Sequence, residues 1–131
     1  MSNKCGAKKV KDPFTGDVFA SKKEYNRWCE LRMLERAGKI TDLKKQVPFE
    51  LIPTQREEST EVYKAGPQKG LPKPGAIIER GLKYVADFTY DKDGEYIVED
   101  VKGCKKGATY ELFVIKRKLM LFVHGIRVKE I

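Results

Sequence analysis

The chain has few of the residues that build a zinc site or a disulfide framework. It contains one histidine and three widely spaced cysteines, Cys5, Cys29 and Cys104, with no Cys-x-x-Cys pair. A structural zinc ion takes four Cys or His ligands at close spacing, so no zinc site is expected. An odd number of scattered cysteines favours reduced thiols, and therefore a cytoplasmic protein, over a disulfide scaffold.

Long apolar runs are also missing. No run of about 18 apolar residues occurs, so we expect no membrane span. The first residues are polar and basic and have no apolar core of the kind that a signal peptide needs. The 131 residues are the size of one domain, and a hydrophobic content of 40% is enough to form a core.

Positive charge, in contrast, is in excess. Lysine and arginine number 27 against 19 aspartates and glutamates, which gives a formal charge of +8. This balance favours a polyanionic partner, which can be DNA, RNA or an anionic membrane surface. We predict a flexible basic arm over residues 1–13, whose lysines could follow a phosphate backbone without reading its sequence: Lys4, Lys8, Lys9 and Lys11.

Hydrophobic spacing and turn signals predict two helices. Ser21 and Glu24 form a capping-box pattern at the start of the first helix, and Gly38 is its expected end. Its apolar stripe consists of Tyr25, Trp28, Leu31 and Leu34. The second helix is predicted over residues 109–123, before Gly125, with an apolar face that consists of Leu112, Ile115, Leu119 and Phe122.

Alternating patterns predict four strands, over residues 46–52, 82–90, 95–102 and 126–131. The element order α-β-β-β-α-β predicts an α/β (α+β) fold in which helices flank a mixed central sheet. One domain is expected over residues 14–131. Residues 54–80, rich in proline and glycine, are expected to form a long loop within it, and loops of this length are usually functional or mobile.

Two neighbouring predicted strands carry a cluster of charged residues, with Asp87 on the first strand and Asp100 and Lys102 on the second. Residues i and i+2 of a strand face the same way, so Asp100 and Lys102 share a face. A two-residue Asp93-Gly94 loop would place Asp87 opposite Asp100, whereas a bulged turn would place Asp87 opposite Glu99. Either register crowds negative charge inside the sheet, which is unfavourable for stability alone. A divalent cation would offset the repulsion, because hard cations bind carboxylate oxygens.

Such a cluster has the components that phosphodiester hydrolysis needs. A metal held by two carboxylates binds the phosphate and activates water. A neighbouring lysine orients that water or neutralises charge that builds on the phosphate oxygens. The plainer alternative is a surface ion pair between Asp100 and Lys102 on an edge strand, because the Asp-x-Lys pattern alone is common.

The pair Ala86-Asp87 followed by Glu99-Asp100-Val101-Lys102-Gly103 resembles the signature of the PD-(D/E)XK nuclease superfamily, with Ala86 in place of the leading proline. With Ser21-Lys22-Lys23-Glu24-Tyr25 and Gln46-Val47-Pro48-Phe49, the chain is also similar to a phage family of small proteins placed among these nucleases. The resemblance implies a restriction-endonuclease-like core. It also implies a Mg²⁺-dependent endonuclease, with Mn²⁺ as a substitute, that cuts DNA during phage recombination, replication or processing.

The same resemblance implies roles for individual residues. Asp87 and Asp100 would be metal ligands, together with the carbonyl group of Val101, and Lys102 would be the catalytic lysine. Glu24 would match an acidic ligand that is carried on a helix in junction-resolving nucleases. Its place in the capping box supports an equal alternative, in which it only caps the helix. Glu99 is expected to point away from Asp100 and to form an ion pair.

Basic residues after the motif are predicted to contact phosphates: Lys105, Lys106, Lys116, Arg117 and Lys118. The alternative is that they form a solvated helix face. No base-reading element is recognisable, which favours structure-selective or weakly sequence-specific cutting. A non-catalytic nucleic-acid-binding accessory protein and an RNA nuclease remain as alternative functions. Resolving members of the superfamily act as dimers, so a homodimer is expected.

Overall fold

The computed structural model describes residues 7–131 and divides them into two compact units. The first unit comprises the residues up to Phe49 together with Tyr84–Ile131, and the second unit comprises Glu50–Lys83. The sequence predictions for Lys4 and Cys5 lie outside the described residues. None of the described helices is long and apolar enough to cross a membrane.

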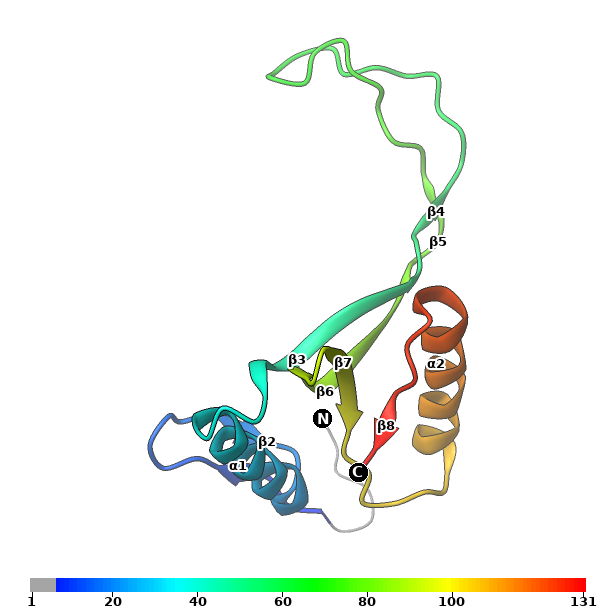
Figure 1. Cartoon of the computed structure of the whole chain (residues 1–131). Helices are drawn as coiled ribbons and strands as arrows, with labels where there is room; N and C mark the ends of the chain where they lie inside the picture. The colour runs from blue at the N-terminus through cyan, green and yellow to red at the C-terminus, as the bar shows by residue number, and fades with distance from the viewer. Residues whose placement is uncertain (1–6) are drawn as a thin grey trace. The chain divides into compact units, whose positions relative to one another are not determined.

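The first unit is a mixed α+β structure with a four-stranded sheet in the order β3-β6-β7-β8 (Figure 1). β6 and β7 are antiparallel, whereas β7 and β8 are parallel. The strands are β3 (Thr41–Ile52), β6 (Leu82–Lys92), β7 (Glu95–Asp100) and β8 (Lys129–Glu130), and the helices are α1 (Lys22–Arg36) and α2 (Ala108–His124). The predicted class and the order of these six elements are confirmed, although β3 begins earlier and β8 is shorter than predicted. β7 ends at Asp100, so Lys102 follows the strand and is not part of it as predicted.

Helix α1 begins and ends where the sequence indicates. The Ser21 side chain accepts a hydrogen bond from the backbone N–H of Glu24 (3.1 Å), and Gly38 has a φ of +74° just after the helix. The helix packs against β6 through a core that includes Trp28 stacked on Phe88, with ring centroids 5.8 Å apart. Three members of the predicted stripe belong to this core, while Leu34 is exposed.

Helix α2 extends one residue beyond each end of the predicted range and buries a different face. Phe113 and Met120 are its buried residues, and Phe113 lies 6.2 Å from the Tyr84 ring of β6. In the predicted apolar face, Ile115 is 54% exposed and Phe122 is 87% exposed. The prediction of the buried face was wrong because α2 carries apolar residues on more than one side, and spacing alone does not say which side meets the sheet.

The hairpin between β6 and β7 settles the register that the sequence left open. Lys92 pairs with Glu95, and Phe88 pairs with Glu99. Asp93 and Gly94 both have positive φ, 52° and 79°, as a two-residue type I′ turn requires. The two-residue loop is therefore confirmed, and the bulged alternative is excluded.

A short hairpin precedes α1. β1 (Val10–Lys11) pairs with β2 (Val18–Phe19), and the buried Asp12 side chain accepts a hydrogen bond from the Phe14 N–H (2.8 Å) in the connecting turn. The boundary of the expected flexible arm at residue 13 is therefore corrected, because residues 10–13 belong to this hairpin. Lys8 and Lys9 are exposed before it.

The second unit contains the region expected as a long loop. β4 (Gln55–Arg56) pairs with β5 (Ile77–Glu79) in an antiparallel ribbon. Beyond the ribbon, an isolated bridge joins Val62 to Pro72. Because β3 and β6 are neighbours in the sheet, the whole unit is an insertion between two adjacent strands.

Candidate functional site

The predicted acidic pair and its lysine line one cavity of about 290 Å³. Asp87 lies on β6 and Asp100 ends β7, and the hairpin register, continued by one residue, places them opposite each other. Asp100 is only 5% exposed. Gln46, Tyr84 and Lys116 line the same cavity. The fold thus brings two carboxylates from neighbouring strands and two lysines to one small space.

Lys102 is held beside Asp100 by two contacts. Its Nζ lies 2.5 Å from Asp100 Oδ2 and 3.8 Å from the centroid of the Phe113 ring on α2. Asp100 Oδ2 is buried, and none of its neighbours has the angles of a hydrogen bond. Its interaction with Lys102 is therefore an ion pair without a well-aligned hydrogen bond. At 2.5 Å from a carboxylate oxygen that is largely shielded from water, the Lys102 ammonium group is strongly attracted to Asp100.

The two carboxyl groups hold their protons more tightly than in water. Burial raises the pKa of Asp100 to about 7, with a further contribution from the charge of Asp87, although Lys102 opposes the shift. Burial also raises the pKa of Asp87 to about 6, and the Glu24 carboxylate adds to it. The backbone N–H of Val101 opposes this second shift by donating to Asp87 Oδ2 (2.9 Å). Burial and the mutual repulsion of the carboxylates therefore disfavour the charged form of this pair, and Lys102 offsets only part of that cost.

Glu24 makes the capping contact that was one of its two predicted roles, and it also lies near the acidic pair, while its role as a metal ligand stays a prediction. Its Oε2 accepts a hydrogen bond from the Ala20 N–H (2.9 Å) just before α1, which is a capping contact. Its Oε1 accepts from the side-chain amide of Gln46 (3.4 Å), and the same amide donates to Asp87 Oδ1 (3.3 Å). One carboxylate therefore caps the helix and also borders the acidic pair.

Gln46 was not singled out as a site residue by sequence reasoning. It has a φ of +53° inside β3, which is unusual for a residue other than glycine. Such a backbone conformation is unfavourable by about 1–3 kcal/mol and tends to occur at functional sites. The only signal in the sequence was that Gln46 begins a stretch used for the family resemblance, and strand alternation did not distinguish it from its neighbours.

Tyr84 was also missed, because its aromatic ring reads as a core residue. The ring is buried between Phe49 and Phe113, with centroid distances of 6.4 Å and 6.2 Å. Its hydroxyl group has no aligned hydrogen-bond partner among the described residues. Burial raises the pKa of this hydroxyl group, and the nearby Asp100 carboxylate raises it further. Tyr84 therefore forms an apolar wall with one polar atom next to the acidic pair.

Glu99 lies outside this cavity, as predicted. Its carboxylate is fully buried and accepts two hydrogen bonds from the Arg27 guanidinium, at 2.8 and 2.6 Å. The hydroxyl group of Tyr90 donates a third hydrogen bond. The charge of Glu99 is thus satisfied on the α1 side of the sheet, which leaves Asp100 as the acidic residue of the motif that faces the cavity.

The acidic pair fits a hard divalent cation. Mg²⁺ is commonly held by one or two carboxylates, with waters and substrate phosphates as its other ligands. In residues 7–131, no group of three or more His, Cys, Asp or Glu side chains forms a complete metal cage, so any site here would be of this open kind. The raised pKa values fit a pair of carboxyl groups that a bound cation would help to ionise. The Val101 carbonyl could contribute, because the Val101 backbone already contacts Asp87.

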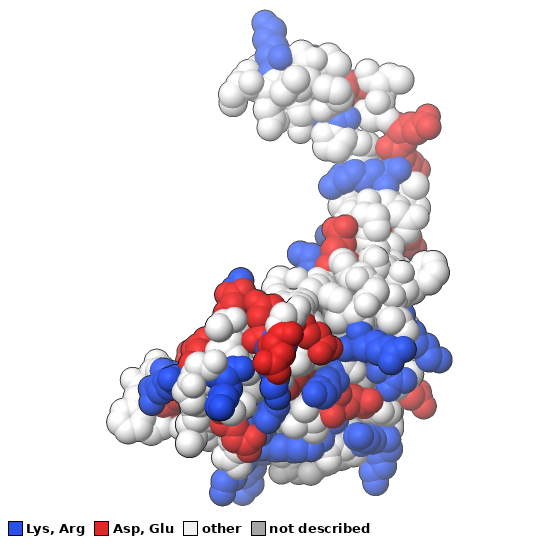
Figure 2. All heavy atoms as spheres, viewed as in Figure 1, with Lys and Arg blue, Asp and Glu red and all other residues white. Residues whose placement is uncertain are grey.

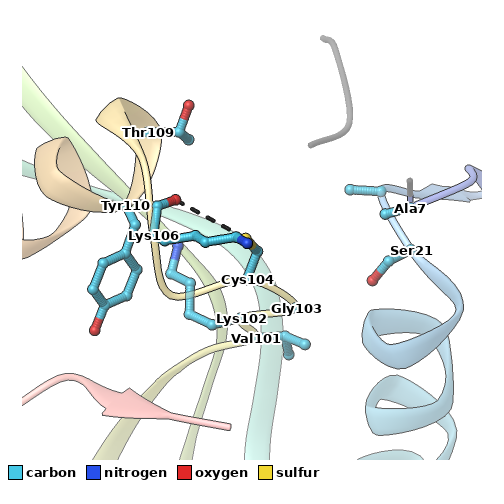
Figure 3. Close-up of a pocket in the computed structure, with 10 residues that line it drawn as sticks. Ala7, Ser21, Val101, Lys102, Gly103, Cys104, Lys106, Thr109 and Tyr110 are labelled. Atoms are coloured by element: carbon cyan, nitrogen blue, oxygen red, sulfur yellow. Dashed lines mark hydrogen bonds between the residues drawn. The ribbon is translucent and has the colours of Figure 1, made fainter. Parts of the chain in front are cut away.

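A second cavity, of about 190 Å³, lies beside the start of α2 (Figure 3). Lys102 and Thr109 line both cavities, and Lys106 lines only this one. Cys104 also lines it and is disulfide-bonded, so the expectation of reduced thiols is wrong for Cys104. Cys29 is free.

The basic residues predicted to contact phosphates do not form one set. Lys116 lines the acidic cavity and Lys106 the second cavity, while Lys105 and Lys118 are exposed. Arg117 instead donates to Glu130 on β8 (3.1 Å), which makes it a structural contact in this state.

One family model matches residues 2–125, which is nearly the whole chain. No curated protein and no solved structure matches the chain. The interpretation of the site therefore depends on its own geometry and chemistry.

Proposed function

The chain belongs to the family described as "Protein of unknown function (DUF1064)", and we propose that it is a metal-dependent endonuclease of the PD-(D/E)XK type that hydrolyses phosphodiester bonds of DNA. The observation that carries the proposal is that Asp87, Asp100 and Lys102 line one cavity, with Lys102 paired to Asp100. Two facing carboxylates are unfavourable inside a sheet, and a structural role alone gives no compensation for them. A surface ion pair does not describe Asp100, which is 5% exposed.

Each group has a distinct task in this proposal. A bound Mg²⁺ or Mn²⁺ supplies the Lewis acid that lowers the pKa of water and withdraws charge from the phosphate. Asp87 and Asp100 hold the cation, with the Val101 carbonyl beside them. Once a cation offsets the charge of Asp100, the Lys102 ammonium group is available to a phosphate oxygen, where it stabilises developing negative charge. Gln46 fixes Asp87 relative to Glu24 through its amide.

The surroundings of the cavity fit an anionic polymer. Lys116 adds positive charge to the acidic cavity, and Lys106 adds it to the adjoining one. Lys105 and Lys118 extend this charge over exposed surface. We propose structure-selective or weakly sequence-specific cutting of DNA in the cytoplasm, in recombination, replication or processing of phage DNA. The restriction-endonuclease-like arrangement of the core is part of the same proposal.

We also propose that the active form is a homodimer. The apolar stripe of α2 that was predicted to be buried is exposed in the single chain, with Ile115 and Phe122 at 54% and 87% exposure. An exposed apolar stripe of this kind fits a protein–protein contact. A two-fold pair of active sites would allow both strands of a duplex or junction to be cut.

The test is cleavage of end-labelled linear duplex, single-stranded and four-way-junction DNA in Mg²⁺, in Mn²⁺ and in EDTA. Wild type is compared with Asp100→Asn and Lys102→Met, and we expect a loss of at least about 100-fold in each variant because an electrostatic group of the transition state is removed. Matched controls are Asp91→Asn and Lys92→Met, which make the same changes at the hairpin end of β6.

Cleavage in EDTA, or equal cleavage by wild type and Asp100→Asn, would contradict the proposal. Metal-independent DNA binding with no cutting of any substrate would instead favour the non-catalytic accessory protein. Preferential cutting of an RNA competitor with the same dependence on Asp100 and Lys102 would favour the RNA nuclease.

A further inference from the structure

The second unit has a defined backbone but almost no core of its own. Of residues 50–83, only Leu51 is buried. The backbone is nevertheless held by specific contacts, including Glu57 N–H to Ala76 O (2.9 Å) and the Arg56 guanidinium to Gly75 O (2.9 Å). The backbone of this segment is held by hydrogen bonds and its side chains are exposed. Such a segment is suited to contacting a partner and contributes little to the hydrophobic core.

The end of this unit is a closed loop, here called the tip, which comprises residues 62–76. Tyr63 and Leu71 are joined by a backbone hydrogen bond of 3.1 Å, and Gly70 donates back to Tyr63 at 2.9 Å. The bridge between Val62 and Pro72 closes its base. The tip is thus a narrow continuation of the β4–β5 ribbon.

Charges are segregated along the unit. The tip contains three lysines, Lys64, Lys69 and Lys73, and no carboxylate. No ion pair is found for Lys64 or Lys69 in the described part of the chain, and Lys73 has only a 4.0 Å contact to Glu61, in which both side chains are more than half exposed. Such an exposed pair contributes little. Figure 2 shows a basic side chain projecting from this end of the unit.

We propose that the tip enters a groove of duplex DNA and that its three lysines contact the phosphate backbone. The major groove of B-form DNA admits a two-stranded β-ribbon. β4 and β5 form a two-stranded antiparallel ribbon, the tip beyond it carries charge of one sign only, and Leu71 is 55% exposed beside the lysines. This inference deepens the proposed function, because it assigns substrate binding to a second surface and rests on DNA as the substrate.

The experiment measures DNA affinity as a function of salt with the full-length Asp100→Asn protein, which prevents cutting. A labelled 20-base-pair duplex is titrated by fluorescence anisotropy at several KCl concentrations. The slope of log K against log salt is negative, and each lost phosphate contact reduces its magnitude by about 0.9. Lys64→Gln/Lys69→Gln/Lys73→Gln is therefore expected to reduce the magnitude of the slope by about 2 to 3, with a melting temperature equal to that of the parent.

The matched control removes three exposed lysines of the first unit, as Lys39→Gln/Lys44→Gln/Lys92→Gln, so that the net charge falls equally. It is expected to change the slope by less than about 1. Equal slopes for the two triple variants would overturn the inference. So would an equal effect of the tip substitutions on a duplex RNA of the same sequence, because the major groove of A-form RNA is too narrow for the ribbon.

The outcome is separable from that of the proposed function. Wild type that cuts DNA while the tip substitutions leave the slope unchanged would overturn only this inference. Tip-dependent binding by a wild type that cuts nothing would overturn only the nuclease activity. Failure of the wild type to bind duplex DNA would overturn both.

Discussion

At the scale of single residues, the raised pKa values of Asp87 and Asp100 predict how stability depends on pH. A carboxyl group in an unfolded chain loses its proton near pH 4. In the folded chain, Asp87 holds its proton to about pH 6 and Asp100 to about pH 7. The folded state therefore binds more protons than the unfolded state between these values, and its stability falls as pH rises through this window.

In EDTA, we expect the free energy of unfolding, measured with urea, to decrease between pH 4.5 and pH 7.5. Asp100→Asn should flatten the profile, because it removes the group with the larger shift. A free energy of unfolding that rises over the same range in the wild type would contradict this prediction. Added Mn²⁺ should raise the melting temperature at pH 7.5 more than at pH 5.5, because the cation must displace the carboxyl protons.

Arg27 and Glu99 form the buried ion pair on which the α1 side of the sheet depends. Glu99 is fully buried, so loss of Arg27 would leave its charge without a cation. We expect Arg27→Ala to lower the free energy of unfolding by about 3–5 kcal/mol in urea denaturation. The control is Glu30→Gln, which removes the other, exposed partner of Arg27 and should change stability by less than about 1 kcal/mol. Equal effects of the two variants would show that burial of Glu99 does not matter.

At the scale of elements, the β6–β7 turn sets the register that aligns the acidic pair. Gly94 has a φ of +79°, and a side chain added there would meet no atom within 4 Å. Gly94→Ala therefore introduces backbone strain without a clash, and should lower the free energy of unfolding by about 1–2 kcal/mol. Gly103→Ala is the matched control, because that site is equally open and lies outside the positive-φ range. A chemical denaturation series compares the two variants, and equal stability would contradict the turn assignment.

The same comparison shows which features a sequence can reveal. The ends of α1 and the loop between β6 and β7 were predictable because Ser21, Gly38 and Gly94 act locally, Ser21 through its side-chain cap and the two glycines through a positive φ. The meeting of Asp87 with Asp100 was one of two registers that the sequence allowed, and the positive φ angles of Asp93 and Gly94 in the structure decide for it. The buried face of α2 was not predictable, since several of its sides are apolar and the contact of Phe113 with Tyr84 decides between them.

The role of Gln46 in the site could not be predicted from the sequence, for a different reason. Its amide reaches Glu24 and Asp87 while its backbone has a positive φ within β3. Alternation rules assume regular strand geometry, so they give no indication of such an irregularity. Residues at irregular backbone positions are where tertiary structure overrides local pattern.

At the scale of the whole molecule, the inserted second unit should be separable from the first. The first unit contains the sheet, both helices and the acidic cavity. β3 and β6 are neighbours, so replacement of residues 54–80 with Asn-Gly would join them by a hairpin. We expect the shortened chain to unfold cooperatively and to bind Mn²⁺ with unchanged affinity in calorimetry. Loss of cooperative unfolding would show that the first unit needs the insertion.

The exposed stripe of α2 predicts the oligomeric state. If it is the contact between two copies, Ile115→Glu/Phe122→Glu should convert a dimer to a monomer in light scattering coupled to size-exclusion chromatography. A buried charge without a partner is too unfavourable for such an interface to persist. The control is Met33→Glu, which places one charge on an exposed apolar residue of α1. A wild type that is monomeric at all concentrations would exclude the contact.

The two carboxylate oxygens of Glu24 have different partners, and they connect ligand binding in the cavity to the stability of the first turn of α1. One of its oxygens holds the backbone just before α1, while the other borders Asp87 through Gln46. A ligand that draws this carboxylate inward therefore weakens the cap, and a firm cap resists that movement. A ligand bound in the cavity should therefore increase the rate of amide hydrogen exchange at Ala20 and in the first turn of α1.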